Sequence, residues 1–424
     1  MGGLARRVGY IKSFKLRSNQ EVPALFVDAG NLFTDDKAIG NQLPADGVAK
    51  NRWVTRSYGK FNHDAANVTY NDFVYLTELF KKDGYKQRVE EYPFISKIIS
   101  ANVHPLDKNL EAPAPYIIRE ITLQRAKPGG KIRVGITGFT EAKPVVSGDK
   151  AVQTAGFEIE DPFAAAKRII PEIKKKADYV IALAYMPQAD AQRLATEVLG
   201  IDTIIAAHQL SVQEEPARFN QTTVTTSFYQ TKFLGELRYY LRGDGVIENQ
   251  KNRYIGLDDA IPDDPNAAEL VAEAHTEFTN ELNKAQQNQQ AAVTAADTAI
   301  LSGKSLYVGG DACTACHQKE AQIWQKSGHA HAMETLQRRN QHLDTDCVKC
   351  HVVGYQKGGF QALYSTPQFA NVQCEACHGP GRVHSENPQK GYGFMPTPAG
   401  CVSCHTHNNS PDFNFAAYWP RIKH

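Results

Sequence analysis

Four copies of the motif Cys-x-x-Cys-His lie in the last quarter of this 424-residue chain and use all eight of its cysteines. They are Cys313-Thr-Ala-Cys316-His317, Cys347-Val-Lys-Cys350-His351, Cys374-Glu-Ala-Cys377-His378 and Cys401-Val-Ser-Cys404-His405. Two thiols at this spacing can bond the two vinyl groups of one porphyrin, and the histidine that follows can bind its iron. The motifs therefore predict four covalently bound haem c groups.

Zinc ribbons are the alternative, because Cys-x-x-Cys pairs also bind zinc. A zinc site, however, has no reason to place a histidine directly after every pair. A thioredoxin-like redox site needs one such pair rather than four. The eight cysteines are therefore interpreted as attachment residues, and the four histidines as proximal iron ligands.

The second axial ligand of each iron is expected to be histidine. The region holds only two methionines, Met333 and Met395, but it holds six further histidines. These are His329, His331, His342, His384, His407 and His424. Such a surplus favours bis-histidine ligation, which gives lower reduction potentials than histidine–methionine ligation.

Spacing separates some of these candidates. His329 and His331 are two residues apart in an expected helix, so they face different sides and cannot both serve one haem. We expect His329 to bind a neighbouring haem. His407 is a weak candidate because it is too close to its own motif, residues 401–405, to reach the far face of that haem.

Composition divides the chain into three parts. Residues 1–263 alternate strand-like runs with helical stretches, which is typical of an α/β domain. The expected strands are 24–28, 98–103, 132–138, 179–184 and 203–207, and the expected helices are 71–82, 162–176 and 189–199. Residues 264–302 are rich in Ala, Glu, Gln and Asn, which predicts a helical linker. Residues 303–424 have little apolar periodicity, so we expect a mostly helical domain whose core is porphyrin.

Charge and hydropathy exclude several classes of protein. The formal net charge is +1, so nothing indicates nucleic-acid binding. The longest apolar run, residues 179–186, is too short to cross a bilayer. Covalent haem is attached outside the bacterial cytoplasm, so we expect a periplasmic or extracellular protein. The chain begins Met1-Gly-Gly-Leu-Ala-Arg-Arg without an export signal, and we therefore expect its start to be truncated.

The haem segment resembles a known family of tetrahaem cytochromes, typified by the electron acceptor of hydroxylamine oxidoreductase. The resemblance covers about residues 307–424 and is carried by three stretches. They are Trp324-Gln-Lys-Ser-Gly-His329, Cys374-Glu-Ala-Cys-His-Gly-Pro-Gly-Arg-Val-His384, and residues 410–424 ending in Ile422-Lys-His424. It implies that His329, His384 and His424 are distal ligands. It also implies that one haem can be five-coordinate, and we assign that role to the His351 haem, whose open site could instead take His331 or His342.

Residues 1–283 resemble the metallophosphoesterase domain of the 5′-nucleotidase and thiosulfohydrolase group. The matching stretches are Gly2-Gly-Leu-Ala-Arg-Arg, Phe26-Val-Asp-Ala-Gly-Asn31, Ser100-Ala-Asn-Val, Arg133-Val-Gly-Ile-Thr-Gly-Phe and Ile201-Asp-Thr-Ile-Ile-Ala-Ala-His208. The resemblance implies a two-sheet α/β sandwich that holds two divalent metals, which clamp phosphate and activate water.

The family's metal ligands are mostly lost in this chain. The bridging aspartate is Asn31, the histidine of the next strand is replaced around Tyr185-Met186, and the Gly-His-x-His signature keeps only His208. Residues 67–72 cover the Asn-His-Glu element and supply no histidine, and the first Asp-x-His strand is absent. Two dications need several charged ligands, so we expect this site to be lost and no catalytic residue to remain.

The leading functional hypothesis is an electron carrier with a redox donor and a redox acceptor as partners, of unknown oligomeric state. Two alternatives stay open. One is a metal-dependent nucleotide or sulfur-ester hydrolase coupled to haem oxidation. The other is an oxyanion reductase at the five-coordinate haem.

Overall fold

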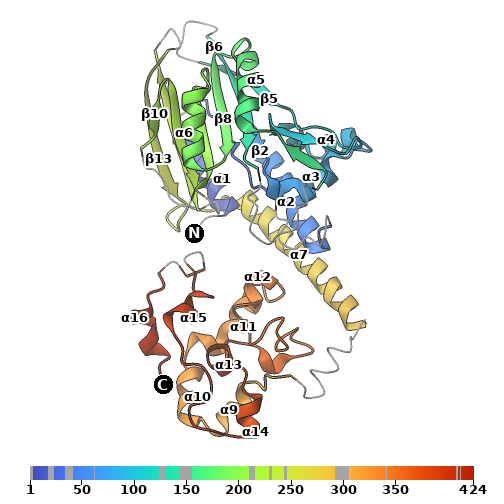
Figure 1. The fold of residues 1–424 in the computed structure, drawn as a ribbon, viewed down its shortest axis with the longest axis vertical. Coiled ribbons are helices and arrows are strands. Elements are labelled where there is room, and N and C mark those ends of the chain that lie inside the picture. The colour runs from blue at the N-terminus through green and yellow to red at the C-terminus, as the bar shows by residue number, and fades with distance from the viewer. Residues whose placement is uncertain are drawn as a thin grey trace. The chain divides into compact units, whose positions relative to one another are not determined.

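The computed structural model describes residues 3–17, 23–33, 42–61, 63–123, 130–142, 155–209, 215–228, 232–242, 246–291, 305–339, 341–406, 409–410 and 412–424. The chain forms two compact units, Met1–Ala274 and His275–His424. The boundary between them in the chain falls within one long helix (Figure 1). That helix, α7 (Pro265–Ala291), lies in the stretch expected to be a helical linker. It begins where the Asp264 carboxylate accepts a hydrogen bond from the backbone N–H of Ala267, at 3.0 Å. Residues 292–304 of the expected linker lie outside the described residues.

Two sheets form the centre of the N-terminal unit. The larger has the order β10-β11-β9-β8-β6-β5, in which β6, β8, β9 and β11 are parallel and the two outer strands are antiparallel. Its strands are Ala217–Phe219, Thr222–Phe228, Thr203–Gln209, Tyr179–Tyr185, Lys131–Thr140 and Tyr116–Thr122. The smaller is a parallel sheet of β1 (Val27–Asp28), β2 (Ala65–Asn67) and β3 (Ile98–Ile99).

Strand β8 shows how the layers pack, because both of its faces are buried. Val180, Ala182 and Ala184 pack with α5 (Pro162–Lys174) and α6 (Gln188–Glu197) on one face. Leu183 and Tyr185, on the other face, pack with Ala29, Ala65 and Ile99 of the smaller sheet. A strand buried on both faces has a continuous apolar sequence, which is why Tyr179–Tyr185 was predictable.

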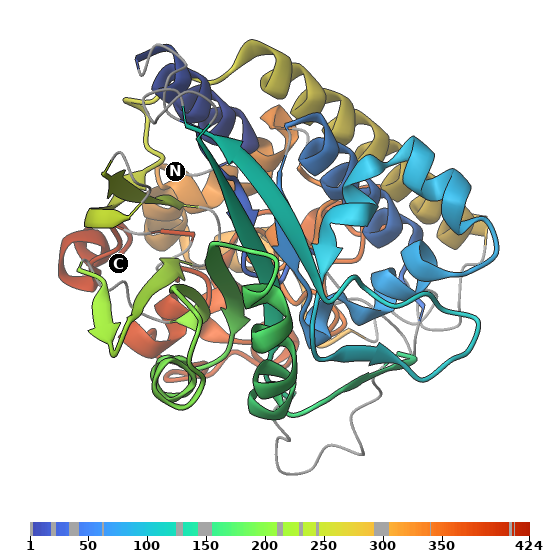
Figure 2. The same ribbon diagram turned by 90° about the horizontal axis from the view of Figure 1, so that it is seen from above.

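Helices cover the outer face of the smaller sheet as well. α2 (Ala45–Lys60), α3 (Phe73–Phe80) and the 3-10 turn η2 (Pro93–Lys97) enclose an apolar cluster that includes Phe73, Leu76 and Phe94. Figure 2 shows these blue helices and the green helices α5 and α6 on opposite sides of the strands. The two-sheet α/β sandwich expected from the sequence is confirmed.

Several expected elements differ in their limits. The strand expected at 24–28 is reduced to β1, and that at 98–103 is two short strands, β3 and β4 (Val103–Pro105). The helix expected at 71–82 begins with a 3-10 turn, η1 (Tyr70–Asp72), before α3. Other elements were not predicted. They include α2, β2, β5, β10 and β11, and also α1 (Leu4–Arg17), α4 (Tyr85–Glu91), β7 (Phe157–Ile159), β12 (Phe233–Leu241) and β13 (Ile247–Gly256).

The C-terminal unit consists of short helices joined by turns. They are α9 (Gly310–Thr314), α10 (Gln318–Gln325), α11 (Ala332–Arg338), α12 (Thr345–Val348), α13 (Cys374–His378), α14 (Arg382–Glu386), α15 (Pro398–Val402) and α16 (Phe415–Tyr418). One small apolar cluster, around Met333, Leu336 and Val353, lies beside α11 and α12. Such a unit has little side-chain core, as expected for a domain built around porphyrin.

Replacing Leu183 with alanine should lower the free energy of unfolding of the N-terminal unit by about 2–5 kcal/mol, because it opens a cavity between the two sheets. Leu199→Ala, at a leucine that is 75% exposed, should change that free energy by less than about 0.5 kcal/mol. Urea unfolding followed by circular dichroism measures both values. Equal effects of the two substitutions would contradict the layered packing.

Candidate haem sites and a region resembling a metal site

Three histidines of the Cys-x-x-Cys-His motifs each face a second histidine ring. The ring centres are 6.1 Å apart for His317 and His384, 6.0 Å for His405 and His329, and 5.8 Å for His378 and His424. Two imidazoles on one metal need about 6 Å between ring centres, since a metal–nitrogen bond is about 2 Å and the nitrogen lies about 1 Å from the ring centre. All three separations fit an iron held between the rings.

Hydrogen bonds orient several of these imidazoles. Nδ1 of His378 lies 2.9 Å from the carbonyl oxygen of Phe394, and Nδ1 of His424 lies 2.9 Å from that of Ile422. Nδ1 of His351 lies 2.7 Å from the carbonyl oxygen of Ala332. A carbonyl can only accept, so each Nδ1 carries the proton and each Nε2 is left available to a metal.

His351 differs from the other three motif histidines, because no second histidine ring of the described residues faces it. His331 is exposed and pairs instead with Glu334, at 3.3 Å. His342 lines a cavity of about 200 Å³ beside α12, and burial lowers the pKa of its imidazole. His407 lies outside the described residues.

All eight cysteines are free thiols, and thiols of different motifs are neighbours. A hydrogen bond joins Cys313 to Cys374 and raises the pKa of Cys313. Burial and the nearby thiol of Cys404 raise the pKa of Cys350 to about 11. Burial, with Cys401 and Cys404 close by, raises the pKa of Cys377. Each of the four motifs therefore has a cysteine thiol near a thiol of another motif.

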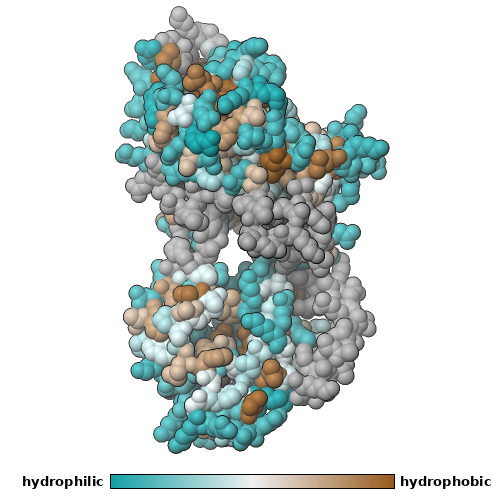
Figure 3. All heavy atoms as spheres, viewed as in Figure 1, coloured by the Kyte–Doolittle hydropathy of each residue, from teal (hydrophilic) through white to brown (hydrophobic). Residues whose placement is uncertain are grey.

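These residues fit covalently bound haem. The thiols are not consumed by disulfides, and the facing imidazoles leave room for a metal. Figure 3 shows brown and pale side chains on the visible face of the C-terminal unit. Exposed apolar residues near the paired histidines include Val383, Tyr392, Phe394 and Met395, and the Tyr392 ring stacks on His384 with centres 5.0 Å apart. Apolar side chains beside the ligands are what a porphyrin requires for packing.

Neutral side chains lie at several positions of the N-terminal unit where its resemblance to metallophosphoesterases leads us to expect metal ligands. The Asn71 amide donates a hydrogen bond to the Asn31 side-chain oxygen, at 3.1 Å. The hydroxyls of Tyr70 and Tyr185 are hydrogen-bonded, and their rings meet edge to face with centres 5.7 Å apart. Tyr185 pairs with Ala207 across β8 and β9, so His208 follows directly in this layer, although its side chain is not described.

Asp72 stabilises the backbone around this site. Its buried carboxylate accepts hydrogen bonds from the backbone N–H groups of Phe33 and Thr69, both at 2.7 Å. Thr69 and Asp72 form a reciprocal capping box at η1. Burial raises the pKa of Asp72 to about 7, and the hydrogen bonds oppose that rise. The Thr-x-x-Asp spacing was the sequence signal for this role, which the sequence prediction missed.

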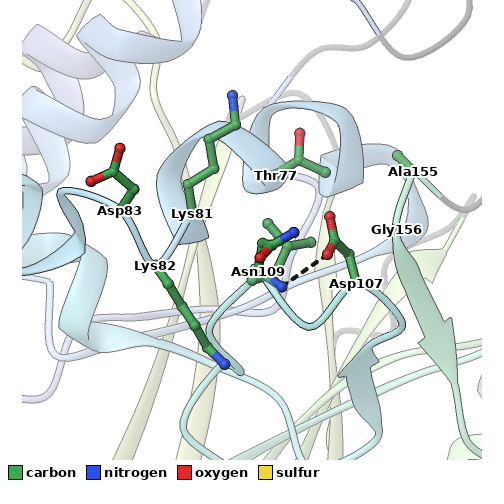
Figure 4. Close-up of a pocket in the computed structure, with 9 residues that line it drawn as sticks. Thr77, Lys81, Lys82, Asp83, Asp107, Asn109, Ala155 and Gly156 are labelled. Atoms are coloured by element: carbon green, nitrogen blue, oxygen red, sulfur yellow. Dashed lines mark hydrogen bonds between the residues drawn. The ribbon is translucent and has the colours of Figure 1, made fainter.

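Within the described residues, no three His, Cys, Asp or Glu side chains converge to hold a metal ion. A cavity of about 490 Å³ lies elsewhere, between α3 and the loop containing Asp107 and Asn109 (Figure 4). The backbone N–H of Asn109 donates to Asp107 there, at 2.8 Å, and Lys81 pairs with Glu78, at 2.8 Å. Neither Asn31 nor Tyr185 lines this cavity.

Comparison with known proteins agrees with the two-part organisation. Residues 312–379 match the family model "Cytochrome c554 and c-prime". Cytochrome c-554 of Nitrosomonas europaea is 38% identical over 111 residues, which are 21% of this chain and 47% of that protein. The chain therefore spans about half the length of this relative. The C-terminal region is therefore similar to cytochromes of this family, which implies covalently bound haem c.

The N-terminal unit has the α/β fold of metallophosphoesterases. The sulfate thiohydrolase SoxB of Thermus thermophilus superposes with a TM-score of 0.52 at 15% identity, over 66% of this chain and 48% of that one. The trifunctional nucleotide phosphoesterase YfkN of Bacillus subtilis is 28% identical over 229 residues, which are 49% of this chain and 14% of that protein. These likenesses establish the fold of the unit. In the part of the chain that is described, no helix is long and apolar enough to span a membrane.

The pKa of Asp72 predicts a pH effect on stability. Between about pH 4 and pH 7 the folded protein holds a proton that the unfolded chain has released, so the stability contributed by Asp72 falls as the pH rises through this range. Asp72→Asn lacks this dependence. The free energy of unfolding of the wild type, measured relative to Asp72→Asn, should therefore decrease by a few kcal/mol from pH 4 to pH 7 and stay constant above it. A constant difference over the whole range would show that Asp72 is ionised throughout.

Proposed function

We propose that this chain is an exported electron carrier that binds four haems, three of them between two histidines. The observation that carries the proposal is the set of three histidine pairs with ring centres 5.8–6.1 Å apart. The fourth motif, residues 401–405, lies beyond the residues matched by the family model. The number of haems therefore rests on the repeated motif.

Haem iron supplies one-electron chemistry at each site. Bis-histidine ligation blocks both axial positions, so substrates cannot bind and electrons alone are exchanged. The neighbouring thiols place the Cys313 motif beside the Cys374 motif and the Cys374 motif beside the Cys401 motif. They also place the Cys401 motif beside the Cys347 motif. This continuity supports transfer of electrons between the sites and on to separate donor and acceptor proteins.

We further infer that the metallophosphoesterase-like domain, residues 1–263, no longer holds a dinuclear metal site and now serves as a scaffold or docking domain. The support is the neutral pair of Asn31 and Asn71, together with Tyr185 where the family has a histidine ligand. Two dications need anionic ligands, and amides and phenols supply none at neutral pH. Residues 264–302 are the linker and residues 303–424 the haem domain in this proposal.

A second activity is supported by one observation. His351 has no facing histidine within the described residues, so its iron would keep one axial position for a small ligand. A small nitrogen or sulfur oxyanion is the class of substrate that such a site could reduce.

The export of the protein to the periplasm or beyond follows from the covalent haem and is part of the same proposal.

The ligand assignment is tested by His329→Ala, His384→Ala and His424→Ala. Each substitution should leave one iron with a single axial histidine and convert one low-spin haem to high spin, while all haems stay covalently attached. Electron paramagnetic resonance of the oxidised protein measures the spin states, and mass spectrometry counts the haems. His331→Ala, at an exposed histidine paired with Glu334, is the control and should match the wild type. A variant that keeps every low-spin signal would exclude its histidine as a ligand.

The loss of hydrolysis is tested with purified holoprotein, Mn²⁺ and three substrates: bis(p-nitrophenyl) phosphate, AMP and a thiosulfate ester. We expect no turnover above the rate without protein. Metal-dependent turnover that disappears in His208→Ala would overturn the proposed loss of the metal site.

A further inference from the structure

A buried carboxylate lies inside the third haem motif. Glu375, between Cys374 and Cys377, is 4% exposed. Its two oxygens accept hydrogen bonds from three backbone N–H groups: Val308 at 3.0 Å, Gly309 at 2.8 Å and Gly381 at 2.7 Å. No lysine or arginine of the described residues forms an ion pair with it. These N–H groups are therefore its compensating partners, and hydrogen bonds to a charged acceptor are stronger than neutral ones.

The three donors belong to two segments that position haem ligands. Val308 and Gly309 directly precede α9, which carries Cys313 of the first motif. Gly381 directly precedes α14, which carries His384. His317 and His384 are the facing pair of the first haem site. Glu375, a residue of the third motif, thus links the two segments that supply His317 and His384, the two ligands of the first haem.

Neighbouring contacts strengthen this link. The Gln373 side-chain oxygen accepts a hydrogen bond from Gly310, at the start of α9, at 2.5 Å. The backbone N–H of Arg382 donates to the carbonyl oxygen of Leu306, at 3.0 Å. A Cβ atom at position 381 would lie 3.1 Å from a Glu375 carboxylate oxygen, so any larger residue there would press on the carboxylate.

We propose that Glu375 is a positioning residue that holds His384 opposite His317 and so maintains bis-histidine ligation at the first haem. This inference rests on the proposed function, because it takes these two histidines to be iron ligands. Loss of the carboxylate removes its three hydrogen bonds between the start of α14 and the start of α9, and leaves the Arg382–Leu306 bond as a weaker link. His384 is then held less firmly opposite His317, although Cys313, Cys316 and His317 still attach the haem.

The test uses the full-length holoprotein of Glu375→Gln, which keeps the size of the side chain but replaces one acceptor oxygen by a donor. We expect the variant to have one more high-spin iron per chain than the wild type, and this iron should bind CO in the reduced state. The number of covalent haems should be unchanged. His384→Ala is the reference for complete loss of this ligand. Glu386→Gln, at an exposed glutamate on the same helix, is the matched control and should be unchanged.

These measurements distinguish the role of Glu375 from the ligation of the iron by His384. If His384→Ala changes the spin state and Glu375→Gln does not, the role of Glu375 is wrong and the ligation stands. If His384→Ala itself changes nothing, the ligation is wrong. If Glu375→Gln does not accumulate as holoprotein, Gly381→Ala decides, because its Cβ crowds the same carboxylate at a φ of −99° that alanine tolerates. It should produce a partial change at the same haem, and wild-type spectra would overturn the proposal.

Discussion

Paired imidazole rings organise the C-terminal unit. Each pair joins a motif histidine to a histidine from another segment: His317 with His384, His405 with His329, and His378 with His424. Among the described residues of the unit, the buried apolar side chains form one cluster beside α11 and α12. In the N-terminal unit, by contrast, three apolar clusters hold four layers of helices and sheets together. Apolar layers therefore account for much more of the packing in the N-terminal unit than in the C-terminal one.

The sequence allowed the haem motifs to be predicted because attachment is a local property of five consecutive residues. The partners of His317 and His378 depend on tertiary packing, and they were expected only through resemblance to a family. The contacts of Glu375 were not predicted, because an x position of the motif carries no signal and two of its three N–H donors, Val308 and Gly309, come from a distant segment. In the N-terminal unit, β8 was predictable from its continuous apolar run, whereas the half-exposed strands β12 and β13 were not.

Neutral side chains lie in the region of the N-terminal unit that resembles a dinuclear metal site. Asn31 has a φ of +63°, a left-handed conformation that asparagine adopts more readily than most residues. An asparagine can therefore hold this turn without a carboxylate charge. Tyr185 packs against Tyr70 in the interior. The layers beneath are held by apolar contacts such as those of Leu183, and this packing requires no metal ligand.

The exposed apolar side chains between Val383 and Val402 have a consequence for how the protein is made. Phe394 and Met395 are 70% and 81% exposed in the chain without cofactor. Exposed apolar side chains promote aggregation of a newly made chain. A haem that packs against these side chains would therefore protect the chain from aggregation.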